Sequence, residues 1–320
     1  MLGLMQDRPL LISTLIDHAA RYHPEVEIVS RTCEGPTVRT NWRDLSKRVA
    51  RLANALRRLG IKPGDRVASL AWNTHRHVEL YFAVSGIGAV LNTVNPRLFP
   101  EQIDYIVNHA ENRVLFFDIT FAGLVGGLRD RFSTVEHVVA MTDAMHLPPE
   151  TPSALVYEDL LAPEADEITW PVFDERTASA LCYTSGTTGN PKGVLYSHRS
   201  TILHSFMVCT VDGFRLSSAD SVLLVVPLFH VNAWGIPYAS AMCGAKMVLP
   251  GPALDGKSLF ELAVAEACTF SLGVPTVWLG FFQHIDGTPG IDTSALRLNR
   301  VVIGGSAAPR AVIERFRRLG

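Results

Sequence analysis

The sequence predicts an α/β fold with mostly parallel sheets. Short apolar runs of strand length alternate with amphipathic runs of helix length along most of the chain. This βαβ rhythm is typical of parallel strands whose faces are covered by helices. The chain has 320 residues, of which 48% are hydrophobic, so it is long enough for two subdomains around a buried core.

The first helix of this rhythm has clear boundary signals. Thr40 or Asn41 can cap a helix that begins near Trp42. Apolar residues then recur at helical spacing, and Gly60 can end the helix. The elements expected after it are a strand at 66–72, a helix at 78–87, a strand at 90–94, a helix opening at Pro100, and strands at 113–118 and 135–141.

The rhythm stops in a proline-rich and acidic stretch, residues 142–175, which also holds a short helical pattern at 155–161. We interpret it as a surface connection that closes a first subdomain, 1–175, before a second subdomain, 176–320. A flexible linker is the alternative, but Trp170 and Phe173 favour packing. In the second subdomain we expect strands at 178–182, 194–198, 221–226, 246–249, 269–272 and 300–303, and helices at 201–211, 259–267, 276–283 and 309–319.

Charge and cysteine content exclude several classes of protein. Lysine and arginine number 29 against 31 acidic residues, and this balance argues against nucleic acid or an anionic membrane as the main partner. The five cysteines form no Cys-x-x-Cys pair, which favours reduced thiols over disulfides or a zinc site. No secretory signal or membrane-length apolar run is evident, so we expect a cytoplasmic protein without a membrane span.

The most informative segment is Tyr183–Gly193, which reads YTSGTTGNPKG. Small residues let a backbone approach a phosphate closely, and successive amides in a Gly-rich turn form an anion site. Because an apolar strand is expected on each side of the loop, the two strands and the loop would form a hairpin-like clamp. The candidate phosphate-binding residues are Thr184, Ser185, Gly186, Thr187, Thr188, Gly189 and Lys192.

The loop does not match a Walker A motif. That motif needs Gly-Lys-Ser/Thr at the opening of a helix, whereas Lys192 lies between Pro191 and Gly193 and no helix signal follows it. A flexible surface turn is the alternative. Such a turn needs one or two glycines, not this ordered set with a lysine, so we favour a phosphate-binding loop.

Two further segments follow predicted strands. His230 comes after the strand at 221–226 and is bracketed by Phe229 and Trp234, at the end of a parallel strand where ligands commonly bind. A structural histidine is an equally good interpretation. Gly304–Ala307 follows the strand at 300–303, where small side chains would admit a flat ring. An ordinary βα turn is the alternative for this segment on its own.

Two clusters of basic residues are interpreted as structural, without a ligand. His75, Arg76 and His77 suggest a metal site, but three adjacent residues do not share one face of a helix or strand, so we expect a solvated helix start. The arginines of the last predicted helix lie near its C-terminus, where positive charge is favourable without any ligand.

Taken in order, Tyr183–Gly193, Pro227–Gly235 and Gly304–Pro309 resemble motifs of the adenylate-forming superfamily of acyl-CoA synthetases, luciferases and peptide-synthetase adenylation domains. The sequence His-Val-Asn-Ala-Trp resembles the fatty-acyl-CoA synthetase branch. Leu10–His23 and Asn95–Pro100 are similar to its medium-chain and methylmercaptopropionate-type CoA ligases. The resemblance covers essentially the whole chain. It implies the large N-terminal domain of that fold, with two stacked α/β subdomains.

The resemblance implies an ATP-dependent acid–CoA ligase. In such enzymes a carboxylate attacks the α-phosphate of ATP to give an acyl-adenylate and pyrophosphate, and the thiol of CoA then displaces AMP. The protein contributes mainly positioning and electrostatics. A small carboxylic acid, ATP and CoA would be the substrates, with Mg²⁺ as the metal. Homodimerisation is expected from the resemblance alone.

The same resemblance assigns roles to residues. Thr184–Thr188 and Lys192 would hold the β- and γ-phosphates, with Thr184 contacting Mg²⁺. His230 would lie by the carboxylate and the α-phosphate, so His230, Lys192 and Thr184 are the catalytic candidates. Val231 and Trp234 would line the junction of nucleotide and acyl group, where the matching tryptophan gates an acyl tunnel. The wall beside adenine would be formed by Gly304, Gly305, Ser306 and Ala307.

Three features of the superfamily have no counterpart in the sequence. They are an aromatic-Gly-x-Thr-Glu motif that binds Mg²⁺, a Thr-Gly-Asp motif that holds ribose, and a small C-terminal domain with the adenylation lysine. We therefore expect the N-terminal piece of a longer enzyme, with an incomplete second subdomain and no activity by itself. The alternatives are a truncated nucleotide-binding module without enzymatic function, an adenylation enzyme with an acceptor other than CoA, and a Walker-type NTPase.

Overall fold

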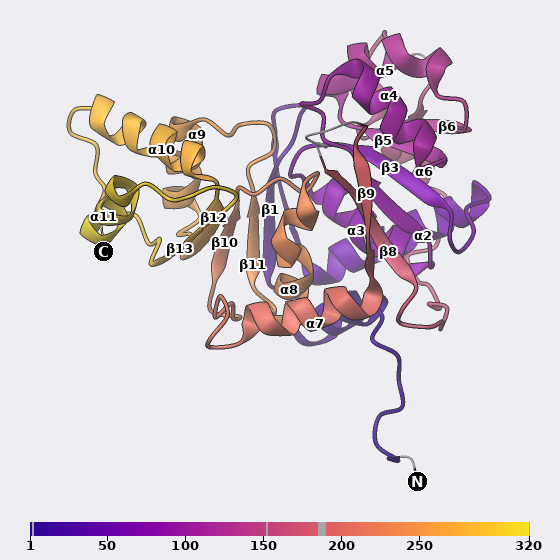
Figure 1. Ribbon diagram of the computed structural model, residues 1–320, viewed down its shortest axis with the longest axis horizontal. Coiled ribbons are helices and arrows are strands. Elements are labelled where there is room, and N and C mark those ends of the chain that lie inside the picture. The colour runs from indigo at the N-terminus through magenta and orange to yellow at the C-terminus, as the bar shows by residue number, and fades with distance from the viewer. Residues whose placement is uncertain (2, 152, 185–189, 320) are drawn as a thin grey trace.

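The computed structural model describes residues 1, 3–151, 153–184 and 190–319. It contains two mixed, mostly parallel sheets with helices packed on their faces, as the sequence predicts (Figure 1). The larger sheet has the strand order β7-β6-β5-β3-β4-β8-β9, and the smaller sheet has the order β13-β12-β10-β11-β1-β2. In each sheet a single antiparallel pair lies at one edge, β8 with β9 and β1 with β2.

The larger sheet and its helices are built from residues 42–197. Its strands are β3 (Arg66–Leu70), β4 (Val90–Thr93), β5 (Asn112–Phe117), β6 (His137–Ala140), β7 (Leu155–Val156), β8 (Ala178–Thr184) and β9 (Lys192–Ser197). The helices within this part are α2 (Trp42–Arg58), α3 (His75–Gly86), α4 (Pro100–His109), α5 (Ala122–Leu128) and α6 (Tyr157–Leu161), with short 3-10 turns at Ile119–Phe121, Arg129–Arg131 and Ala144–His146.

The smaller sheet draws on both ends of the chain. Its strands are β1 (Glu27–Arg31), β2 (Thr37–Asn41), β10 (Ser221–Leu224), β11 (Lys246–Leu249), β12 (Phe270–Gly273) and β13 (Arg300–Ile303). The remaining helices are α1 (Ser13–Tyr22), α7 (His198–Cys209), α8 (Ile236–Cys243), α9 (Gly256–Ala265), α10 (Pro275–Gly287) and α11 (Arg310–Leu319).

Helix α2 begins where the sequence predicts. The side chain of Asn41 accepts a hydrogen bond from the backbone N–H of Asp44 at 2.8 Å, which satisfies one of the free donors at the helix start. Gly60, with φ of +83°, follows the last turn and takes a left-handed conformation that other residues avoid.

The N-terminal segment departs from the prediction. The sequence predicts no element before the helix at Trp42, but the chain forms α1 and the β1–β2 hairpin there. Strand β1 pairs in parallel with β11, more than two hundred residues away, as Figure 1 shows. Conversely, β8 pairs with β4 of the larger sheet. The sheets therefore do not divide the chain at residue 175, because each recruits strands from across that boundary.

The stretch 142–175 packs against the body of the protein. The ring of Trp170 covers Gly86 on α3 so closely that a side chain on this glycine would collide with it. The indole N–H of Trp170 donates to Asp17 on α1 at 3.1 Å. Phe173 lies edge-on against His198 at the start of α7, with ring centroids 5.0 Å apart. These contacts connect the stretch to elements on both sides of it in sequence.

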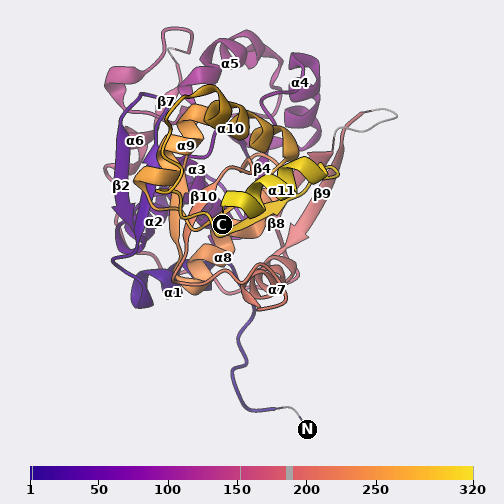
Figure 2. The ribbon, with the colours of Figure 1, turned by 90° about the vertical axis from the view of Figure 1, so that its left-hand side faces the viewer.

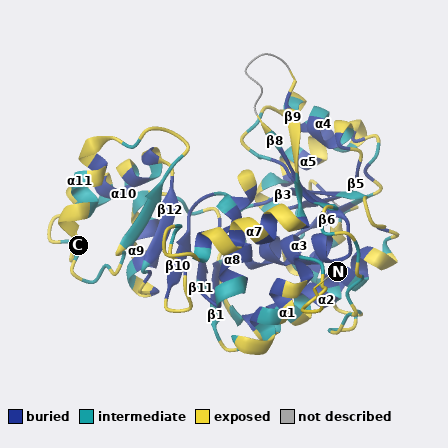
Figure 3. Cartoon of the chain, turned by 60° about the horizontal axis from the view of Figure 1, so that its bottom comes forward, coloured by how far each residue is buried: buried dark blue, intermediate teal, exposed yellow. Residues whose placement is uncertain are grey.

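The prediction of a solvated helix start at His75–His77 is wrong. All three residues are buried, as is every other residue of α3 (Figure 3). His75 contacts Ser30 of β1 at 3.2 Å, and the ring of His77 contacts Ser69 of β3 at 2.9 Å. Helix α3 therefore lies against strands of both sheets, an arrangement that local sequence does not reveal. None of the helices in the described ranges has the length and apolar character to cross a membrane.

Candidate functional site

The predicted phosphate loop joins the two strands of an antiparallel hairpin. Strands β8 and β9 run side by side (Figure 2), and Thr184 lies opposite Lys192 at the last pair before the loop. Both residues are exposed, and the Thr184 hydroxyl donates to the Lys192 carbonyl at 3.4 Å. Ser185, Gly186, Thr187, Thr188 and Gly189 lie outside the described residues.

His230 lies in the connection between β10 and α8, and its side chain is exposed. The segment that leads to His230 is hydrogen-bonded to the side chain of Asn73, which follows β3. The Asn73 amide donates to the carbonyls of Leu224 and Val226, each at 2.8 Å, and its oxygen accepts from the backbone N–H of Leu228 at 2.7 Å. Asn73 is a functional candidate that sequence analysis missed. Its only local signal was an asparagine directly after a predicted strand.

The residues after His230 form a left-handed turn. Val231, Asn232, Ala233 and Trp234 have φ angles between +47° and +52°, and Gly235 follows at +70°. For residues other than glycine this conformation costs roughly 1–2 kcal/mol each, so tertiary contacts must hold the turn. One such contact is the thiol of Cys182 on β8, which donates to the side-chain oxygen of Asn232 at 3.4 Å. It brings the phosphate hairpin against the segment that follows His230.

A second contact joins the turn to the Gly304 segment. A Cβ atom placed on Gly304 would lie 2.8 Å from the Trp234 ring, so the ring occupies the space that a side chain would need. Trp234 is half-buried, whereas Gly305, Ser306 and Ala307 are exposed beyond the end of β13. The structure thus brings Trp234 together with Gly304, and Asn232 together with the strand that carries Thr184.

A cavity of about 400 Å³ opens beside the left-handed turn. Its volume lies within the range of small-molecule pockets. Helix α7 contributes Ser200, Thr201 and His204 to the wall. The remaining lining residues are Tyr196, Phe214, Val231, Asn232, Trp234, Gly235 and Tyr238. Two of the sequence-predicted site residues, Val231 and Trp234, therefore face the same cavity.

The polar groups of this cavity are neutral near pH 7. Burial lowers the pKa of His204, whose ring packs against Gly235, 2.6 Å from where a Cβ atom would lie. Burial also raises the pKa of Tyr238, and its hydroxyl has no hydrogen-bond partner in the described part of the chain. A cavity with few charged groups suits an apolar or weakly polar ligand rather than an ion.

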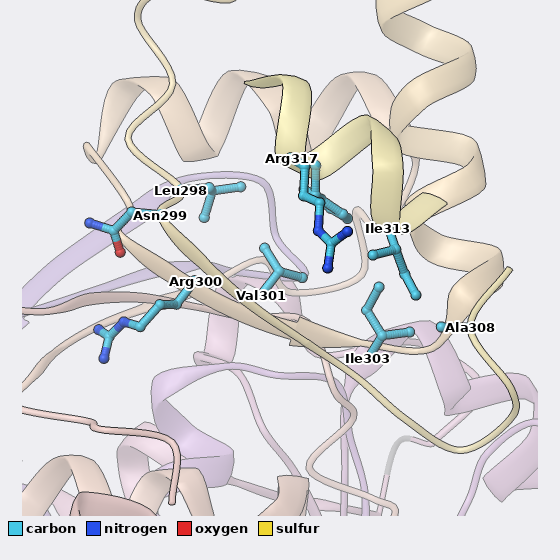
Figure 4. A pocket seen from close by; sticks show the side chains of 9 residues that line it. Leu298, Asn299, Arg300, Val301, Ile303, Ala308, Ile313 and Arg317 are labelled. Atoms are coloured by element: carbon cyan, nitrogen blue, oxygen red, sulfur yellow. The ribbon is translucent and has the colours of Figure 1, made fainter. Parts of the chain in front are cut away.

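A separate hollow lies between β13 and α11 (Figure 4), where Ile313 and Arg317 of the helix face Val301 and Ile303 of the strand. It contains none of the residues predicted to bind substrate or nucleotide, so it is not part of the candidate site.

The described residues include no cluster of three or more His, Cys, Asp or Glu side chains that could hold a metal ion. Near the hairpin tip, Thr184 supplies one exposed hydroxyl oxygen. Mg²⁺ keeps several waters and commonly binds proteins through few ligands plus substrate phosphates. A single hydroxyl oxygen at Thr184 would suffice for a magnesium ion carried mainly by a polyphosphate, and Thr184 as its protein ligand stays a prediction.

Comparisons with known proteins place the chain in a family. A family model described as "AMP-binding enzyme" matches residues 16–320. The 3-methylmercaptopropionyl-CoA ligase of Ruegeria pomeroyi is 53% identical over 99% of this chain. The medium-chain-fatty-acid–CoA ligase of Ectopseudomonas oleovorans is 48% identical over 99% of this chain. The chain spans 58% of the length of each of these two relatives.

Solved structures share the fold. The inhibitor-bound N-terminal domain of FACL13 from Mycobacterium tuberculosis superposes with a TM-score of 0.82 at 25% identity, covering 96% of this chain and 73% of that one. The anthranilate CoA ligase AuaEII, in complex with anthranoyl-AMP, has a TM-score of 0.81 at 23% identity, covering 95% of this chain and 57% of that one.

Proposed function

Because this chain belongs to the AMP-binding enzyme family, we propose that it forms the nucleotide- and acid-binding part of an ATP-dependent acid–CoA ligase. The observation that carries the proposal is the convergence of three separate segments. The Thr184–Lys192 hairpin contacts the turn after His230 through Cys182 and Asn232, and that turn contacts Gly304 through Trp234. Phosphate-binding, acid-binding and nucleotide-binding candidates thus lie around one turn.

The charges of the candidate site suit the first half-reaction. Attack of a carboxylate on the α-phosphate of ATP brings two anions together, so catalysis depends on positioned positive charge and hydrogen-bond donors. Lys192 at the hairpin tip would neutralise the polyphosphate. His230, exposed at the end of the β10 connection, would hydrogen-bond the carboxylate or the α-phosphate. Mg²⁺, when bound with ATP, supplies further charge neutralisation at Thr184.

The cavity beside the turn would take the acyl chain of the acid. Trp234 lines this cavity and also contacts Gly304 of the predicted nucleotide wall, and Val231 lines the cavity beside it. The walls carry no charged group near pH 7, and this favours an aliphatic acid of short to medium length. The relatives named for 3-methylmercaptopropionate and for medium-chain fatty acids support the same class of substrate.

Acid-dependent exchange of pyrophosphate into ATP, measured on the full-length protein, tests the proposal. We expect exchange with aliphatic acids of three to ten carbons, of the order of a hundredfold weaker in Lys192→Ala and His230→Ala variants if each removes one charge or hydrogen bond used in the transition state. If no acid of the panel supports exchange in the wild-type protein, the proposal is wrong.

A second measurement identifies the acyl acceptor. Addition of CoA to the wild-type protein with ATP and an active acid should yield the acyl thioester and AMP. Accumulation of acyl-adenylate without thioester would instead favour an acceptor other than CoA. The use of CoA, the homodimer and the cytoplasmic location remain predictions drawn from sequence resemblance and composition.

A further inference from the structure

Arg97 lies in the loop between β4 and α4, with its guanidinium over two aromatic rings. The guanidinium carbon is 5.8 Å from the centre of the Trp72 ring and 5.7 Å from the centre of the Phe229 ring. The two rings meet edge to face, 6.0 Å apart. Trp72 follows β3 of the larger sheet and Phe229 follows β10 of the smaller sheet, so Arg97 lies where the carboxyl ends of strands from both sheets meet.

Among the described residues, no acidic side chain pairs with the positive charge of Arg97. Its side chain is exposed and takes part in none of the ion pairs formed by the described residues. Other arginines on or beside the same sheet are paired, Arg66 with Glu111 and Arg113 with Glu136. A guanidinium held over aromatic rings makes no hydrogen bond to them along its N–H edge, so its N–H groups stay available for a planar oxyanion.

The aromatic support of Arg97 is rigid. The backbone N–H of Trp72 donates to the buried carboxyl of Asp118 at 2.6 Å, and the indole N–H donates to Thr120 at 2.9 Å. The backbone N–H of Arg97 donates to the side chain of Asn95 at 3.0 Å, which orders the loop itself. Because these groups are held before any ligand arrives, binding would cost little ordering entropy.

The loop that carries Arg97 is also adjacent to the candidate site. Strand β4 pairs with β8 in the register Thr93 opposite Cys182, so the loop starts beside the strand that leads to Thr184. On the other side, Phe229 is the immediate neighbour of His230. Arg97 is therefore flanked by the predicted phosphate hairpin and by the histidine predicted to act at the α-phosphate.

We propose that Arg97 is a phosphate-binding residue, whose guanidinium takes an oxyanion of one of the two phosphate-bearing substrates, ATP or CoA. This inference rests on the proposed function for the identity of the substrates. It adds a cation that lies outside the three motifs, on the loop between β4 and α4.

Steady-state kinetics of the full-length protein separate the two sources of phosphate. Arg97→Gln should raise the KM for ATP in pyrophosphate exchange, or the KM for CoA in thioester formation, by about tenfold or more, the usual effect of losing a charge-assisted hydrogen bond. Arg97→Lys keeps the charge without the planar fork and should recover part of the loss. Arg57→Gln is the matched control, since Arg57 is exposed on α2 and unpaired among the described residues.

Titration calorimetry with Mg-ATP, and separately with CoA, gives a readout that does not depend on turnover. Binding of one of these two ligands should weaken by about tenfold in Arg97→Gln and remain unchanged in Arg57→Gln. Circular dichroism melts establish that both variants are folded. Unchanged KM values and unchanged affinities for both ligands in Arg97→Gln would overturn the inference while leaving the proposed function intact. Failure of wild-type exchange alone would refute the proposed function, and calorimetry would still decide the role of Arg97.

Discussion

At the scale of single residues, close contacts rather than unusual side chains shape the candidate site. Trp234 can line the cavity beside the left-handed turn because Gly304 leaves its ring the necessary space. The left-handed turn from Val231 to Gly235 orients that ring, and the contact between Cys182 and Asn232 helps to hold the turn. A change at any of these positions should therefore act on substrate binding through geometry.

Gly304→Ala should move the Trp234 ring. The new Cβ atom would lie 2.8 Å from the ring, a distance at which one of the two groups must shift. We expect the kcat/KM for the acid in pyrophosphate exchange to fall by about tenfold or more, since displaced groups in a binding site lose positioning. Gly123→Ala on α5 is the control. A Cβ atom there would meet nothing within 4 Å, so this substitution should leave the kcat/KM for the acid unchanged.

Asp118 should make stability depend on pH. Burial raises the pKa of this carboxyl from 3.8 to about 7, against the opposing effect of the hydrogen bond from Trp72. The folded state therefore holds a proton that the unfolded chain releases near pH 4, so this contribution to stability is complete at low pH and is lost as pH rises from about 4 to about 7.

Urea unfolding of wild type and Asp118→Asn at pH 5 and pH 8 measures this effect. Between these pH values, the wild-type protein should lose more unfolding free energy than the variant, by roughly 2.5 kcal/mol, since part of the contribution is already lost between pH 4 and pH 5. Subtracting the change in unfolding free energy of the variant from that of the wild type removes the contribution of the other carboxyl groups. Parallel pH profiles of wild type and variant would contradict the expected titration.

At the scale of elements, helix α2 depends both on the residues at its two ends and on its buried face. Helix α2 starts at a capping asparagine and ends before a left-handed glycine, and one face carries the buried residues Leu45, Val49, Leu52 and Leu56. The apolar face stabilises the helix through packing, whereas the cap fixes where it begins.

Asn41→Ala should destabilise the protein by about 1 kcal/mol, because the N–H of Asp44 would lose its acceptor. Chemical denaturation with intrinsic fluorescence measures the change. Asn41→Ser provides the control, since serine also accepts at this position, and it should restore most of the loss. Equal destabilisation by both substitutions would assign the effect to β2 rather than to the cap.

At the scale of the whole molecule, Asn73 joins the two sheets beside the candidate site. It follows β3 of the larger sheet and binds three backbone groups between Leu224 and Leu228, next to β10 of the smaller sheet. The side chain is only 3% exposed, so water does not readily replace these hydrogen bonds.

Asn73→Ala should lower the unfolding free energy by roughly 3–6 kcal/mol, because it leaves three buried backbone groups unpaired. Activity should fall as well, since the same segment leads to His230. Asn73→Asp should be no better tolerated, because a carboxylate would face the carbonyls of Leu224 and Val226. Denaturation curves that superpose on the wild type would exclude this role for Asn73.

The local parts of the fold were predictable from sequence. Strands β3, β4 and β5, the start of α2, and the hairpin of β8 and β9 follow from periodicity, capping residues and turns. The N-terminal hairpin was missed, and the buried start of α3 was predicted to be solvated. In both cases the partner lies far along the chain, β11 for β1 and Ser30 for His75.

The α/β class, most of the elements and the family motifs follow from the sequence alone, because they depend on residues that are close together in the chain. The three-dimensional structure was needed to assign each strand to its sheet and to find that Trp234 rests on Gly304 and that Asn73 and Arg97 lie beside the segment of His230. The physical reason is that strand pairing and side-chain contact between distant segments depend on burial and shape complementarity in three dimensions, which local spacing does not encode.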